Sequence, residues 1–86
     1  MTSQVKPSRL LEGVIKWLQP YIDRNETLES FKDDCGTMGG SFEVDSFRGY
    51  LDISGGVVSI RDRESIVVFK ATLKTVFPDK KQLTLL

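Results

Sequence analysis

Carboxylates are the side chains in this sequence with the most scope for chemistry. The chain has no histidine and one cysteine, so it cannot build a zinc site of the usual nitrogen and sulfur ligands, a Ser-His-Asp triad or a Cys-His pair. Glu43 and Asp45 would project from one face of a candidate strand, and Glu29 and Asp33 lie one helical turn apart. Either pair could hold a hard cation or share a proton. Charged runs on surface elements are usually solvated, and we favour that interpretation.

Phosphate-binding glycine motifs of the P-loop or dinucleotide-binding type do not occur in the sequence. We therefore expect no catalytic residue, no metal site and no cofactor. A small enzyme built on the carboxylates is the third of three functional hypotheses.

The single cysteine, Cys35, excludes an intramolecular disulfide. It belongs to the apolar stripe of a short candidate helix, which favours a buried, inert thiol over a reactive one. The apolar run 10–22 is interrupted by Glu12, Lys16 and Pro20, so it is too polar for a signal peptide and too short to span a membrane. We expect a soluble, cytoplasmic protein that does not associate with membranes.

Length and charge indicate one small folded domain. The 86 residues fall in the range of a single domain, and 40% apolar with 28% charged residues is ordinary for a globular protein. We expect residues 1–7 to be a flexible N-terminus and residues 8–86 to form the domain. The chain has 12 basic and 12 acidic residues, but residues 61–86 hold six basic and three acidic ones. A nucleic-acid-binding protein that uses these basic C-terminal strands is the second hypothesis.

The N-terminal region has the apolar periodicity of an amphipathic helix. Ser8 is a candidate N-cap, and Pro20 should either end the helix or kink it. Because the periodicity continues past Pro20, we favour a kinked or restarted helix that reaches about Arg24. The apolar residues recur at steps of three and four: Leu10, Leu11, Val14, Ile15, Trp17, Leu18, Tyr21 and Ile22.

A second, shorter helix is predicted from a cap and an apolar stripe. Asn25 or Thr27 can cap it, and Gly36 can end it. Its stripe comprises Leu28, Phe31, Lys32 and Cys35. The glycine-rich segment 37–41 is expected to be a loop, and Phe42 and Val44 could form a further short strand.

Two turns predict the register of an antiparallel meander. Gly55-Gly56 suits a two-residue hairpin turn, which pairs Ile53 with Val58, Leu51 with Ile60, Asp52 with Ser59 and Tyr50 with Arg61. A second turn centred on Arg63-Glu64 pairs Ile60 with Val67 and Val58 with Phe69. The fold class is therefore α+β: an N-terminal amphipathic helix, kinked or restarted at Pro20, and a short helix pack on one face of a three- to five-stranded antiparallel meander.

This register sorts the strand residues onto two faces. The face expected under the helices collects Phe47, Leu51, Ile53, Val58, Ile60, Val67, Phe69, Ala71 and Leu73. The second face collects Tyr50, Asp52, Val57, Ser59, Arg61, Ile66, Val68, Lys70 and Thr72. A sheet face open to solvent usually alternates to polar residues, so the apolar members of the second set are surplus.

The surplus supports the first hypothesis, a small non-enzymatic protein-interaction module of regulatory, adaptor or inhibitor type. Apolar and aromatic anchors around an arginine are typical of protein interfaces. The partner would be another protein or a second copy of the chain, bound through the second face. The candidate partner-binding residues are Tyr50, Val57, Arg61, Ile66, Val68 and Lys70.

Two short patterns in the sequence point to other functions. Arg48-Gly49-Tyr50 is similar to the opening of the RNP1 motif of RRM domains, but Asp52 stands where a second aromatic is required and the element order differs. The C-terminal Thr84-Leu85-Leu86 resembles a PDZ-domain ligand, and we prefer a closing strand over residues 82–85. No family is assigned from either pattern.

Overall fold

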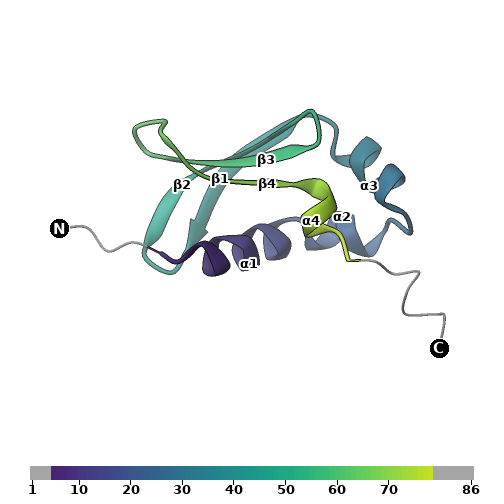
Figure 1. The fold of residues 1–86 in the computed structure, drawn as a ribbon, viewed down its shortest axis with the longest axis horizontal. Helices are drawn as coiled ribbons and strands as arrows, with labels where there is room; N and C mark the ends of the chain where they lie inside the picture. The colour runs from purple at the N-terminus through teal and green to yellow at the C-terminus, as the bar shows by residue number, and fades with distance from the viewer. Residues whose placement is uncertain (1–4, 79–86) are drawn as a thin grey trace.

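Helices pack on one face of a four-stranded antiparallel sheet, which confirms the α+β prediction. The computed structural model describes residues 5–78. Figure 1 shows α1, α2 and α4 on one side of the sheet and α3 at its end. The strands follow one another as a meander in the order β1-β2-β3-β4. The elements are α1 (Pro7–Trp17), α2 (Gln19–Asp23), α3 (Leu28–Cys35), β1 (Met38–Val44), β2 (Phe47–Ser54), β3 (Val57–Asp62), β4 (Val67–Thr72) and α4 (Leu73–Val76).

The N-terminal helix restarts at Pro20, as predicted. Helix α1 ends at Trp17, and helix α2 begins at Gln19, next to Pro20. Pro20 occupies the second position of α2, where a helix does not need the missing N–H. The predicted cap at Ser8 is wrong: α1 begins at Pro7 with Lys6 as its N-cap and no side-chain capping bond. Proline at the first helical position has the right φ already, so Ser8 falls inside the first turn.

Helix α3 begins and ends as predicted. Thr27 Oγ1 accepts the backbone N–H of Ser30 at 3.1 Å, and Gly36 ends the helix with a φ of 55°. The loop predicted for residues 37–41 is wrong, because β1 begins at Met38. Gly39 and Gly40 are strand residues where neighbours approach closely: a Cβ at Gly39 would lie 2.7 Å from the carbonyl oxygen of Leu51.

The first hairpin has the predicted register. Gly55 and Gly56 have φ values of 58° and 78°, the positive angles that a tight two-residue turn requires. The four predicted partnerships across it are all present: Ile53 with Val58, Leu51 with Ile60, Asp52 with Ser59 and Tyr50 with Arg61.

The second hairpin has a different register from the predicted one. Val58 pairs with Ala71 and Ile60 with Phe69, while Arg61 pairs with Val67. The register therefore shifts between Ile60 and Arg61, and Val68 is the extra residue of a β-bulge. Because a one-residue slip turns every side chain to the other face, Val67 and Val68 exchange the faces predicted for them.

The hydrophobic core fills the space between the helices and the covered face of the sheet. Phe31 of α3 stacks on Phe77 with ring centroids 4.9 Å apart. Leu73 is buried as predicted, but it belongs to α4 and not to a strand. The buried apolar residues are Leu10, Val14, Leu18, Ile22, Phe31, Cys35, Phe42, Leu51, Ile53, Val58, Ile60, Leu73, Val76 and Phe77.

Two further predictions concern membrane association and the C-terminal residues. None of the helices within residues 5–78 is long and apolar enough to cross a membrane. The closing strand predicted for residues 82–85 and the C-terminal pattern of residues 84–86 lie outside the described residues.

Candidate interaction surface

The face of the sheet that points away from α1, here called the open face, carries a row of side chains that crosses all four strands. Ser41 of β1 lies beside Tyr50, Tyr50 beside Arg61, and Arg61 beside Val67. Tyr50 is 50% exposed and Val67 is 38% exposed. The Arg61 guanidinium is held by a 3.2 Å hydrogen bond from Nη1 to the carbonyl oxygen of Ser65. A positioned cation thus lies between two exposed apolar side chains.

A second row of the open face is more polar. Its cross-strand neighbours are Asp52, Ser59 and Lys70. Two residues further along the strands, Val57 pairs with Thr72. Ser59 is buried, with 8% of its surface exposed. Four predicted partner-binding residues therefore share the open face: Tyr50, Val57, Arg61 and Lys70.

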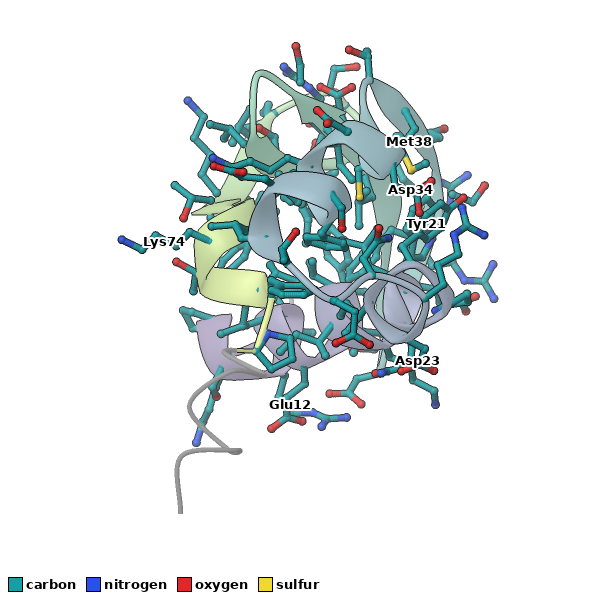
Figure 2. All side chains as sticks on the ribbon, turned by 90° about the vertical axis from the view of Figure 1, so that its right-hand side faces the viewer. Glu12, Tyr21, Asp23, Asp34, Met38 and Lys74 are labelled. Atoms are coloured by element: carbon teal, nitrogen blue, oxygen red, sulfur yellow. The ribbon has the colours of Figure 1, made fainter. Side chains whose placement is uncertain are left out.

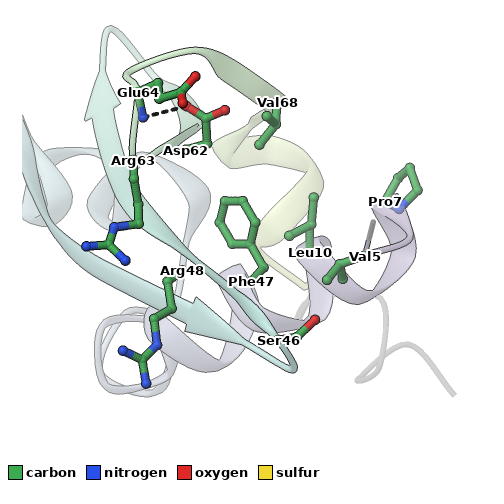
Figure 3. A pocket seen from close by; sticks show the side chains of 10 residues that line it. All are labelled: Val5, Pro7, Leu10, Ser46, Phe47, Arg48, Asp62, Arg63, Glu64 and Val68. Carbon is green, nitrogen blue, oxygen red and sulfur yellow. Dashed lines mark hydrogen bonds between the residues drawn. The ribbon is translucent and has the colours of Figure 1, made fainter. Parts of the chain in front are cut away.

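Val68 does not lie on the open face. It lines a hollow at one end of the molecule together with Val5, Leu10 and Phe47, and Figure 3 shows these side chains around the same space. Leu10 belongs to the covering helix α1, so this hollow opens on the helix side. The bulge at Val68 explains the correction, because the extra residue points to the same side of the sheet as Phe69.

Ile66 lies at the end of the turn between β3 and β4. It is 56% exposed, and its N–H donates to Asp62 Oδ1 at 3.0 Å. The same oxygen accepts the N–H of Glu64 at 2.9 Å, and Ser65 has a φ of 70°. One carboxylate oxygen of Asp62 therefore holds the backbone of the turn at Glu64 and Ile66, and the Ile66 side chain remains exposed.

Val67 is the functional candidate that sequence reasoning missed. An aspartate that accepts the backbone N–H two residues on is a recognised turn former. The turn starts at Asp62, but the Asp62 N–H donates to the carbonyl oxygen of Ile66 and Ser65 has a φ of 70°, so the loop covers residues 63–65 and places Val67 opposite Arg61. The bulge has no comparable signal in the sequence, and it leaves Val68 as the extra residue between the Arg61–Val67 and Ile60–Phe69 pairs.

The carboxylate pairs are used in ion pairs or are solvated. Glu43 accepts a 3.1 Å bond from Arg48 Nε. Asp45 accepts two bonds from Arg9, at 2.8 and 2.9 Å, which lower the pKa of its carboxyl below the usual range. Asp45 lies in the turn after β1 with a φ of 52°, so the prediction that it shares a strand face with Glu43 is wrong.

The remaining titratable candidates are placed as follows. Glu29 and Asp33 are exposed on α3. Cys35 is buried, as predicted, and its desolvation raises the pKa of the thiol, which lowers the thiolate population that a nucleophile needs. Among residues 5–78, no cluster of three or more cysteine, aspartate or glutamate side chains could hold a metal ion.

Charges on the open face are partly neutralised. Arg48 and Glu43 form a pair at its margin, and Asp52 lies in the row of Lys70. Within the described part of the chain, Lys70 and Arg61 form no ion pair. Among the described residues, the face therefore carries two cations without a carboxylate partner next to apolar side chains.

Comparison of the chain with protein-family models, with curated proteins and with solved structures finds no match.

Proposed function

We propose that this chain is a non-enzymatic protein-interaction module that binds a protein partner through the open face of its sheet. The row Tyr50–Arg61–Val67 carries the proposal, because it sets two exposed apolar side chains on either side of an arginine. Aromatic residues and arginine are enriched among the residues that contribute most to protein interfaces. Helices α1, α2 and α4 lie on the other side of the sheet (Figure 1), and Tyr50 and Val67 are exposed, so a partner can reach this row.

The roles of the predicted residues follow from their positions. Tyr50 and Val67 would be desolvated at the centre of the contact, and Arg61 would supply directional hydrogen bonds there. Val57 and Lys70 would lie toward the rim, where charges affect association rates more than affinity. Ile66 extends the contact from the adjacent turn, whereas Val68 is replaced by Val67 in the proposed site.

The proposal includes a compartment and a class. A single, buried thiol suits a protein that works in the reducing cytoplasm. A regulatory, adaptor or inhibitor role suits a small domain that exposes an apolar surface. The carboxylates Glu43 and Asp45 are ion-paired, which supports a non-enzymatic protein.

Single aspartate substitutions test the open face. The full chain is immobilised and used to capture proteins from its host. Val67→Asp and Tyr50→Asp should each abolish capture of a partner retained by the wild type, because a desolvated interface does not accept an unpaired charge. Ser54→Asp is the matched control, since Ser54 is an exposed residue at the far end of β2. Circular dichroism confirms that each variant is folded.

Three results would contradict the proposal. Capture could survive in both Val67→Asp and Tyr50→Asp, or Ser54→Asp could abolish it equally. The chain could instead bind labelled single-stranded oligothymidine with an affinity that falls steeply as salt rises. That result would favour the nucleic-acid hypothesis, because phosphate contacts release counterions.

A further inference from the structure

Three arginines, here called the arginine cluster, gather at the end of the sheet where β2 begins and β3 ends. Arg61 lies on β3 opposite Tyr50. Arg48 precedes and Arg63 follows the last residue pair between these two strands, and both border the hollow at this end of the molecule. Figure 3 shows both side chains leading to the same side, away from Leu10 of the covering helix. The cluster therefore borders the proposed contact row.

Carboxylates of the described chain neutralise only part of this positive charge. Arg48 donates from Nε to Glu43 at 3.1 Å, and 71% of its side chain is still exposed. Arg61 and Arg63 form no ion pair within residues 5–78. A guanidinium is a planar fork of N–H donors that matches the geometry of a carboxylate. The cluster thus has the donors and the charge to bind further carboxylates.

The turn beside β3 holds Arg61 in position. Arg61 Nη1 donates to the carbonyl oxygen of Ser65 at 3.2 Å. Ser65 has a φ of 70°, a left-handed conformation that is uncommon for residues other than glycine, and bonds to Asp62 Oδ1 hold the turn on both sides of it. A side chain that is already ordered loses less conformational freedom on binding. Most of the Arg61 N–H donors are left for a ligand.

Carboxylates on the open face favour a partner with discrete acidic side chains over a phosphate backbone. Glu43 flanks the cluster, and Asp52 lies in the neighbouring row. A nucleic-acid strand carries a negative charge on every nucleotide, so some of its phosphates would lie near these carboxylates. An acidic peptide can instead place its carboxylates at the cluster and its apolar side chains against Tyr50 and Val67.

We infer that the partner binds the open face through an acidic segment, whose carboxylates pair with the arginine cluster while adjacent apolar side chains pack on Tyr50 and Val67. This inference rests on the proposed function, because it names the chemistry of the partner that the open face would bind. Bonds between arginine and carboxylate are frequently bidentate and stronger than bonds between neutral groups. They would fix the orientation of the segment on the sheet.

Peptides of defined charge test the inference. The isotope-labelled full chain is titrated with the end-capped peptide Glu-Glu-Leu-Leu-Glu-Glu-Leu-Leu, in which each side of an extended chain carries both residue types. The amide NMR signals of Tyr50, Arg61 and Val67 should shift, and those of α4 should not. The peptide Lys-Lys-Leu-Leu-Lys-Lys-Leu-Leu keeps the apolar residues and reverses the charge. It should bind roughly tenfold or more weakly.

Variants of the cluster locate the contact. Arg61→Gln and Arg63→Gln should each weaken binding of the acidic peptide roughly tenfold or more, because each removes a charged hydrogen-bond donor. Arg63 is exposed and makes no ion pair with the described residues, so its variant should keep the turn. Lys74→Gln is the matched control: Figure 2 shows Lys74 pointing outward from α4, and this variant should bind like the wild type. Circular dichroism checks that each variant is folded.

Several results would overturn the inference. The acidic and basic peptides could bind alike, the acidic peptide could fail to bind at about 1 mM, a scale on which weak association is visible, or Lys74→Gln could weaken binding as much as Arg63→Gln. Tighter binding of oligothymidine than of the acidic peptide, lost in the same arginine variants, would indicate a nucleic-acid partner instead.

Capture of a host protein separates this inference from the proposed function. Capture that is lost in Val67→Asp but kept when Arg61→Gln and Arg63→Gln are combined would overturn the acidic partner alone, and the open face would still be the contact surface. Capture that survives Val67→Asp and Tyr50→Asp as well would contradict both. Loss of capture in Val67→Asp and in the combined arginine variant, with Lys74→Gln unaffected, is the result we expect.

Discussion

The same strands form both faces of the sheet, but the two faces differ in how far their side chains are buried. Leu51 and Tyr50 are neighbours in β2, yet Leu51 is 1% exposed on the covered face and Tyr50 is half exposed on the open one. On the covered face, apolar side chains stabilise the fold by leaving water. On the open face, Tyr50 and Val67 remain largely exposed and gain little from the fold, and the proposed interface would bury them.

The largest expected effect breaks the covered face. Leu51→Ala should lower the free energy of unfolding by about 2–5 kcal/mol, because it removes buried methyl groups and leaves a cavity. Tyr50→Ala, one residue away, should cost less than about 1 kcal/mol. Urea denaturation of both variants measures the two values. Similar losses in both would mean that the open face is covered in solution, by this chain or by a second copy.

A smaller effect should come from the helix that closes the end of the covered face. Thr27→Ala removes the cap of α3 and should destabilise the protein by about 1 kcal/mol. Ser8 is the matched control: it lies inside the first turn of α1, whose N-cap makes no side-chain bond, so Ser8→Ala should change stability by less than about 0.5 kcal/mol. Equal losses would show that Ser8 caps α1 after all.

The sequence predicted the fold best where a local signal dictates the backbone. Gly55-Gly56 fixed the first hairpin because few residues other than glycine adopt two positive φ angles in succession. Thr27 and Gly36 likewise bounded α3. The glycines of β1 misled the prediction, because glycine also marks strands where another backbone approaches closely, and Gly39 lies against the carbonyl of Leu51.

The candidate site was predicted less completely than the fold. Tyr50, Val57, Arg61 and Lys70 are on the open face as predicted, since their positions depend on the glycine turn or on residues beyond the bulge. Val67 and Val68 were exchanged, because their faces depend on the length of the second turn and on the bulge that follows it. Pairing between strands decides both, and a single strand's sequence does not encode it.

The smallest effect concerns an ion pair at the margin of the covered face, between α2 and α3. Arg24 donates to both carboxylate oxygens of Asp34, at 2.7 and 2.9 Å, and Asn25 donates to one of them. These bonds, that from Arg24 first, hold the pKa of Asp34 below its usual range. The folded state therefore binds this proton less readily than the unfolded state, and the stabilisation is present above the pKa of an unfolded aspartate.

Stability should consequently fall as the pH drops through the unfolded pKa of aspartate, about 3.9, and on through the lower folded value. Urea midpoints measured from pH 6 to pH 2.5 should fall less in Asp34→Asn than in the wild type, and the two proteins should converge at the acidic end. Asp45, whose pKa is lowered by Arg9, keeps some pH dependence in the variant. Asp33→Asn is the control, because Asp33 is exposed and unpaired in the described chain; it should follow the wild-type curve. If Asp34→Asn and Asp33→Asn behave alike, the ion pair does not hold α3 against α2.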